Sequence, residues 1–303
     1  LHSTSRRQRQ MCIRDRANGL NLGSIYALTA LGYTMVYGII RMINFAHGDF
    51  IMVGGFTLFY VIPVMLKLGL PAWFAVFAAI IVCVCVGVLT EQIAYKPVRG
   101  QGSTTALITA LGMSLVLENG ALVIFGSAPR NVPPMFDLPA VSFGSVTIPA
   151  TTILTLVIGL VMMLLLTLFI RYTKLGKAMR AVPEDKIAST LVGINVNKII
   201  TATFAIGSGL AAVASMMYTT SYVSIKNELG ITLGLKAFVA AVLGGIGSVP
   251  GAMIGGLLLG IIEIMVKVYM LPGTYEAVTY LILIVVLLVR PTGLMGKKVS
   301  EKV

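Results

Sequence analysis

The sequence predicts an all-α integral membrane protein that crosses the bilayer many times. Of its 303 residues, 57% are hydrophobic and only 11% are charged, and the mean hydropathy is +0.94. A chain with so little polar surface cannot cover a water-soluble globule, so lipid must solvate it. The charges also collect between apolar runs, most of which can cross about 30 Å of hydrocarbon at roughly 1.5 Å per residue.

Nine apolar runs define the expected helices. Eight are full or nearly full spans, at residues 18–40, 49–66, 71–90, 104–125, 149–170, 198–222, 251–270 and 277–289. The ninth, residues 232–245, is too short to cross without tilting, which favours a half-helix or a re-entrant segment. We therefore predict about eight transmembrane helices plus this shorter element.

The two ends of the chain differ from the transmembrane domain, which we place at residues 17–296. Residues 1–16 carry five arginines against one aspartate and no apolar run, so we expect a polar basic tail that is foreign to the native protein. Removing these five positive charges and one negative charge lowers the net charge from +12 to +8. Residues 297–303 contain three lysines and are expected to be a cytoplasmic tail.

Two connectors differ in charge and proline content. Residues 171–198 hold six lysines and arginines against two acidic residues, whereas residues 126–148 hold four prolines and few charges. Lysine and arginine accumulate in cytoplasmic loops, so we expect the first connector in the cytoplasm and the second outside. The same rule accounts for the positive net charge, so nucleic-acid binding is not needed to explain it. Eight crossings would place Asn18 inside and nine would place it outside, and the sequence leaves both open.

Three segments carry specific motifs. The first, residues 18–50, contains Ile-Asn-Phe-Ala-His-Gly at 43–48. The second is the basic run 176–194. The third, residues 234–256, contains Leu-Gly-Gly-Ile-Gly-Ser-Val-Pro-Gly at 243–251. Together they closely resemble the LivH-type permeases of branched-chain amino-acid ABC transporters.

This resemblance extends from residue 18 to about residue 296 and implies a pore subunit of an ATP-driven importer in the bacterial inner membrane. It implies a heterodimer with a second permease subunit, two cytoplasmic ATPase subunits and an external solute-binding protein. The implied solutes are leucine, isoleucine and valine, with urea or short amides as an alternative within the same permease group. The chain has no Gly-x-x-x-x-Gly-Lys-Ser/Thr loop, so we expect no enzyme activity, cofactor or metal of its own.

The basic run 176–194 contains a predicted coupling helix. Pro183 suits the first helical position, Glu184 and Asp185 complement the positive helix end, and Gly193 can end the helix in the left-handed conformation.

Ile187 and Leu191 fall at helical spacing and give this helix a small apolar face that could seat in a groove of an ATPase partner. The alternative is an ordinary solvated loop helix.

Candidates for the translocation path come from the first and third motifs. Gly244, Gly245, Gly247 and Ser248 break the backbone between two apolar runs, and such a break at membrane depth must be covered by protein or line a water-filled cavity. The alternative is a tight hairpin whose glycines serve close packing.

Asn44 and His47 are the candidates from the first motif. His47 stands at a helix junction, where a hydrogen-bonded structural histidine is the favoured interpretation, and the adjacent Asp49 is expected to cap the next helix.

Four charged residues lie inside the apolar runs. Glu263 and Lys267 are spaced i, i+4 in the favourable order and predict an ion pair within one helix. Glu118 and Lys236 are expected to pair across helices.

The residues present disfavour two other classes of protein. An intramembrane serine protease using Ser248 would need a base, and His47 is the only histidine outside the tail. A self-sufficient channel or secondary carrier would not need the coupling run at 176–193, so this run favours an ATPase-coupled permease.

Overall fold

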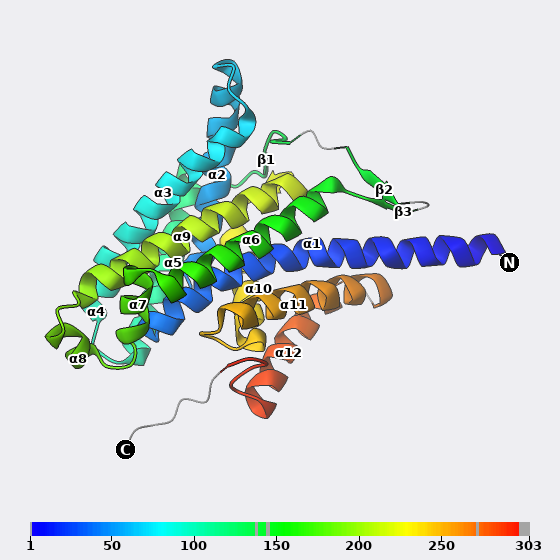
Figure 1. Ribbon diagram of the computed structural model, residues 1–303. Helices are drawn as coiled ribbons and strands as arrows, with labels where there is room; N and C mark the ends of the chain where they lie inside the picture. The colour runs from blue at the N-terminus through cyan, green and yellow to red at the C-terminus, as the bar shows by residue number, and fades with distance from the viewer. Residues whose placement is uncertain (1, 137–138, 144–145, 271–272, 297–303) are drawn as a thin grey trace.

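The computed structural model describes residues 2–136, 139–143, 146–270 and 273–296, and it is a bundle of helices (Figure 1). Within these ranges seven helical segments are long and apolar enough to cross a membrane. Their helices are α1 (His2–Ile40), α2 (His47–Lys67), α3 (Ala75–Thr90), α5 (Ser103–Phe125), α6 (Ala150–Tyr172), α9 (Val196–Ser221) and α11 (Val249–Tyr269). The predicted fold class is confirmed.

Two shorter apolar helices complete the bundle, α10 (Leu229–Gly244) and α12 (Thr274–Val289). Each has 16 residues and spans about 24 Å at 1.5 Å per residue. α10 is the short element predicted at residues 232–245. α12 includes the run 277–289, which is therefore shorter than the other predicted spans.

The remaining elements are short. The span that contains α3 also includes η1 (Ala72–Phe74), the π-helical η2 (Glu91–Tyr95) and α4 (Lys96–Val98). α7 (Lys174–Ala181) and α8 (Lys186–Leu191) lie between α6 and α9. Two antiparallel strand pairs form, β1 (Arg130–Asn131) with β4 (Ser224–Ile225) and β2 (Val141–Phe143) with β3 (Val146–Ile148).

The bundle has two chemically different ends. The strands lie at one end, which we call the strand end, and α4, α7 and α8 lie at the other, which we call the basic end (Figure 1). Asn21 of α1 donates a hydrogen bond to Ser221 at the end of α9, with 3.1 Å between Nδ2 and Oγ, and so lies at the strand end. Gly38 of α1 lies beside Gly247, at the basic end.

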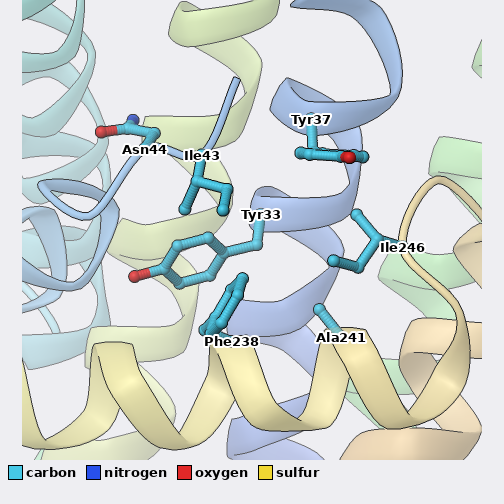
Figure 2. A pocket seen from close by; sticks show the side chains of 7 residues that line it. All are labelled: Tyr33, Tyr37, Ile43, Asn44, Phe238, Ala241 and Ile246. Atoms are coloured by element: carbon cyan, nitrogen blue, oxygen red, sulfur yellow. The ribbon is translucent and has the colours of Figure 1, made fainter. Parts of the chain in front are cut away.

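The segments of the two short helices also link the ends. α10 follows β4, packs against the first turn of α2 through Gly230 and Gly48, and lies across α1 before it stops at the turn beside Gly38 (Figure 2). The segment after α12 donates a backbone hydrogen bond from Leu294 to Leu243, which places the end of α12 at the basic end. Within the described residues the chain therefore passes between the two ends nine times, and Asn18 lies at the strand end.

α1 is the central helix, because 89% of its most apolar window is buried within the protein. It packs against α11 through small residues spaced four apart. A Cβ on Gly256 would collide with the backbone of Ala27, and one on Gly260 would collide with the backbone of Gly23. Such contacts let two helix backbones approach closely in a membrane, where lipid provides little hydrophobic force for association.

α1 is continuous from His2 through the predicted tail boundary at residue 17. It ends at Ile40, after which Arg41 takes a left-handed conformation with φ 57°. The spans of α3, α5 and α6 are only 17–22% buried, so most of their apolar surface faces away from the bundle.

Candidate functional site

The helix predicted from Pro183 to Leu191 is present but begins later than expected. α8 starts at Lys186, and the carboxylate of Asp185 accepts hydrogen bonds from the backbone N–H groups of Ile187 (2.8 Å) and Ala188 (2.9 Å). The placement of Pro183 at the first helical position was wrong. Pro183 lies in the turn between α7 and α8, because the Asp185 side chain satisfies the free N–H groups and so sets the helix start.

The expected end of this helix is confirmed. Gly193 has φ +87°, and its N–H donates to the carbonyl of Thr190 while that of Ile194 donates to Ser189. No atom lies within 4 Å of a Cβ built at Gly193, so the left-handed backbone alone favours glycine there.

One side of α8 is apolar and uncovered in the isolated subunit. Ile187 is 76% exposed, Leu191 82% and the adjacent Val192 76%. Ser189, on the opposite side, is buried, as are Met179 of α7 and Val182 after it. The helix is thus attached to the bundle by one face and presents an aliphatic face beyond the membrane helices.

The glycine-rich break between α10 and α11 is a closely packed turn. A Cβ on Gly244 would collide with the backbone of Gly251, and one on Gly245 would collide with the backbone of Gly296. The Ser248 hydroxyl accepts a hydrogen bond from the N–H of Gly251 (3.2 Å) and caps α11.

The segment after α12 covers this break. The N–H groups of Leu294 and Met295 donate to the carbonyls of Leu243 and Gly244, each at 2.9 Å. These bonds satisfy the free carbonyls at the end of α10, as backbone at membrane depth requires. Gly247 has φ +94° but no atom near its missing side chain, so it differs from Gly245.

The structure brings the first and third motifs together at a small void between helices (Figure 2). The void has a volume of about 10 Å³, room for a single water molecule. Its lining residues come from α1, the α1–α2 connector, α10 and the break, and are Tyr33, Tyr37, Ile43, Asn44, Phe238, Ala241 and Ile246.

Asn44 and His47 are both buried beside this void. The Tyr95 hydroxyl donates to Asn44 Oδ1 at 2.6 Å, which ties the α1–α2 connector to η2. His47 is the first residue of α2, and its ring meets that of Tyr33 edge-on at 4.8 Å. A Cβ on Gly32 would overlap the imidazole, so the histidine fills the space that this glycine leaves.

Asp49 does not cap α2, contrary to expectation. The cap position is Ala46, and Asp49 lies within the first turn, where its carboxylate accepts a hydrogen bond from the Ser114 hydroxyl of α5. The helix begins two residues before Asp49, so the Asp49 side chain contacts α5 and does not cap the helix start.

A buried charged cluster joins α1, α10 and α11. Glu263 is fully buried and pairs with Lys267 at 2.6 Å, as predicted, and with Lys236 at 2.8 Å. Its second oxygen accepts a hydrogen bond from the Tyr26 hydroxyl at 2.7 Å. The expected pair of Lys236 with Glu118 was wrong, because α10 packs against α11 and presents Lys236 to Glu263.

A second buried ion pair was missed. Glu91 of η2 pairs with Arg99, and its other oxygen accepts a hydrogen bond from the Thr201 hydroxyl of α9 at 2.8 Å. Arg99 also donates to the side chain of Asn197 at 2.8 Å. The pair therefore links the start of α9 to η2. Nothing in the sequence indicated it, because Glu91 and Arg99 both lie in the connector between two predicted spans.

The bundle of apolar helices, with a packed glycine break and an exposed helix beyond one end, belongs to the class of multi-pass helical membrane proteins. The family model described as "Branched-chain amino acid transport system / permease component" matches residues 16–287. The chain is 45% identical over 300 residues to the Escherichia coli high-affinity branched-chain amino acid transport system permease protein LivH, covering 96% of this chain and 97% of that protein. It is 44% identical to the corresponding Pseudomonas aeruginosa protein BraD, covering 96% and 98%. The chain therefore belongs to the family of permease components of branched-chain amino-acid transport systems, which are integral proteins of the bacterial inner membrane.

A more distant relative has a different solute in its name. The Haemophilus influenzae ribose import permease protein RbsC is 25% identical over 294 residues, covering 93% of this chain and 86% of that one.

Proposed function

We propose that this chain imports leucine, isoleucine and valine as one half of a membrane-spanning heterodimer with a second permease subunit. Two cytoplasmic ATPase subunits power the heterodimer and an external solute-binding protein supplies it. The solute class is supported by relatives of 44–45% identity whose names specify branched-chain amino acids. The chain has no phosphate-binding loop, so ATP hydrolysis falls to the partners.

The charge distribution supports the orientation. At the basic end the α6–α9 connector, residues 171–198, carries six lysines and arginines. Arg41, Arg99 and Arg290 directly follow α1, α4 and α12, which end there too. Outside residues 1–16 the other end holds fewer positive charges, namely Lys67, Arg130, Lys226 and the two lysines beside Glu263. The positive-inside rule then places the basic end in the cytoplasm and both Asn18 and the proline-rich connector outside.

The observation that carries the ATP-driven mechanism is the uncovered aliphatic face of α8. Ile187 and Leu191 are 76% and 82% exposed at the end assigned to the cytoplasm. Burying each in an ATPase groove would contribute roughly 1.5–3 kcal/mol. A channel or secondary carrier has no use for such a face, whereas a subunit driven by cytoplasmic ATPases needs a docking element there.

The test is transport by the complete complex in proteoliposomes. Ile187→Asp with Leu191→Asp should abolish ATP-driven leucine uptake and binding-protein-stimulated ATP hydrolysis together, while membrane insertion stays normal. Two controls share the helix: Thr190→Asp adds a charge on an exposed polar position, and Ile187→Met with Leu191→Met keeps the face apolar. Both controls should transport. Native uptake by the double Asp variant would replace this proposal with a self-sufficient carrier.

A related permease for urea or short amides is the second candidate. Calorimetry on the cognate external binding protein distinguishes the two candidates, because it shows which ligand that protein binds. Binding of leucine, isoleucine or valine supports our proposal, and binding of urea alone would overturn the solute assignment while leaving the ATP-driven mechanism in place.

A further inference from the structure

A second cavity opens at the strand end, away from the void beside Asn44. Its volume is about 150 Å³, and it lies among α1, α9, α10 and α11. The lining residues are Leu22, Tyr26, Tyr218, Tyr222, Leu229, Thr232, Leu233, Lys236, Glu263 and Lys267. The buried cluster around Glu263 therefore forms part of a cavity wall.

The charges of this cavity do not balance. One carboxylate, Glu263, faces two ammonium groups, since Lys236 and Lys267 bind the same oxygen. Glu228, the cap residue before α10, and Glu276, in the first turn of α12, form no ion pair with either lysine within the described part of the chain. One positive charge is thus left over at a membrane-embedded site, where an ionisable group usually marks a binding or transport function.

Tyr275 of α12 partly stabilises the two lysines. Its ring centroid lies 4.8 Å from Lys236 Nζ and 4.2 Å from Lys267 Nζ. A ring contributes no net negative charge, and the Glu276 carboxylate interacts with the Tyr275 side chain but forms no ion pair with either lysine in the described part of the chain, so the direct ion pairs remain unbalanced. The side chain of Lys267 is 37% exposed against 12% for Lys236, and it is therefore the ammonium that a ligand can reach.

The rest of the cavity wall is apolar or aromatic. Leu22, Leu229 and Leu233 provide aliphatic surface, and the rings of Tyr218 and Tyr222 stack at 5.1 Å. Surplus positive charge beside an aliphatic and aromatic wall suits a small molecule that carries a carboxylate next to an apolar side chain. Branched-chain amino acids have this build.

We propose that this cavity is an entry site for the solute, in which Lys267 and Lys236 bind the α-carboxylate while Glu263 holds both lysines in place. The inference rests on the proposed function, which supplies the amino-acid solute and places the strand end outside the cell. A solute released by an external binding protein would meet this cavity first. The site would then repel cationic amino-acid derivatives that lack a carboxylate.

A cysteine reporter tests the local charge. The reporter is Thr232→Cys in the cavity wall, and Cys12 and the exposed Cys85 are replaced by serine so that neither can react. The purified permease heterodimer is treated with an anionic or a cationic methanethiosulfonate of similar size. Adding Lys267→Met should lower the ratio of the modification rate by the anionic reagent to that by the cationic reagent about tenfold. One unit charge at roughly 6 Å in water attracts one reagent and repels the other, and the two effects together give this factor. Lys267→Arg should keep the ratio.

Ligand protection tests the occupant with both lysines intact, so it does not depend on how the Lys267→Met variant folds. Millimolar L-leucine should slow modification of the reporter by the anionic reagent, whereas L-leucinol, which lacks the carboxylate, should not. Equal protection by both compounds, or no protection by leucine, would overturn the carboxylate site. Protection by phosphatidylglycerol in place of leucine would assign the surplus charge to a lipid headgroup and overturn it as well.

Transport separates failure of this site from failure of the proposed function. In the complete complex Lys267→Met should raise the KM for leucine uptake, because it leaves the Glu263–Lys236 pair intact but removes the surplus charge. If the wild-type complex imports leucine and the Lys267→Met complex has the same KM, the entry site is refuted and the proposed function stands. Wild-type complex that imports no branched-chain amino acid would refute the proposed function, whatever the reporter shows.

Discussion

Gly245 and Gly247 offer a matched test of the packed break between α10 and α11. Both have positive φ, +106° and +94°, so a side chain at either position costs about 1–2 kcal/mol of backbone strain. Only Gly245 also faces other atoms, because its Cβ would overlap the backbone of Gly296 and lie 2.9 Å from the carbonyl oxygen of Thr292. Overpacking of this kind adds roughly 1–3 kcal/mol. Alanine should therefore cost about 2–5 kcal/mol at Gly245 and about 1–2 kcal/mol at Gly247.

The assay is thermal unfolding of each detergent-solubilised variant, followed by fluorescence-detected size exclusion. Gly245→Ala should lower the transition temperature clearly more than Gly247→Ala, and Gly245→Val more than either. Valine at both positions should impair uptake, with the larger loss at Gly245. Equal losses at the two positions would show that backbone conformation alone matters, and would refute the contact between this turn and the segment after α12.

Three further predictions concern helix packing, a buried ion pair and topology. Gly260→Val should disrupt assembly because it collides with α1, whereas Gly120→Val in α5, with no atom within 4 Å, should be tolerated; expression and thermal stability in detergent distinguish them. Glu91→Gln should lower stability by about 3 kcal/mol, near the lower limit for a broken buried pair because the Arg99 side chain is 16% exposed, and adding Arg99→Met should restore part of this in a double-mutant cycle. A membrane-impermeant thiol reagent should label Asn131→Cys but not Thr190→Cys in intact cells, and the reverse pattern would invert the orientation.

Hydropathy predicted the fold because a segment that crosses lipid needs apolar side chains and a backbone that forms its own hydrogen bonds. Every expected apolar run became a helix, and the short run 232–245 became the short helix α10. Local spacing was equally informative within one helix, as the Glu263–Lys267 pair and the end of α8 at Gly193 show. These features depend only on residues close in the chain.

The errors arose where two local signals compete or where neighbours are distant in sequence. Pro183 and Asp185 are both typical of helix starts, and only the hydrogen bonds of Asp185 decide between them. The partner of Lys236 depends on which helix lies beside α10, and hydropathy does not contain that information. The number of crossings, eight or nine, could not be predicted from the sequence for the same reason. It depends on whether the segments that contain the two 16-residue helices link the two ends of the bundle.

The arrangement of α9 joins the proposed docking face to the proposed entry site. α9 starts directly after the α7–α8 segment and extends about 39 Å over its 26 residues. Its first turn is held by Arg99 through Asn197, and its last turn brings Tyr218 to the wall of the charged cavity. α9 is one unbroken helix that is buried over 72% of its most apolar window, so its two ends are joined by continuous packing. If an ATPase displaces α8, we expect α9 to carry that displacement to the cavity, and weakening the Asn197 anchor should reduce this coupling without altering either site.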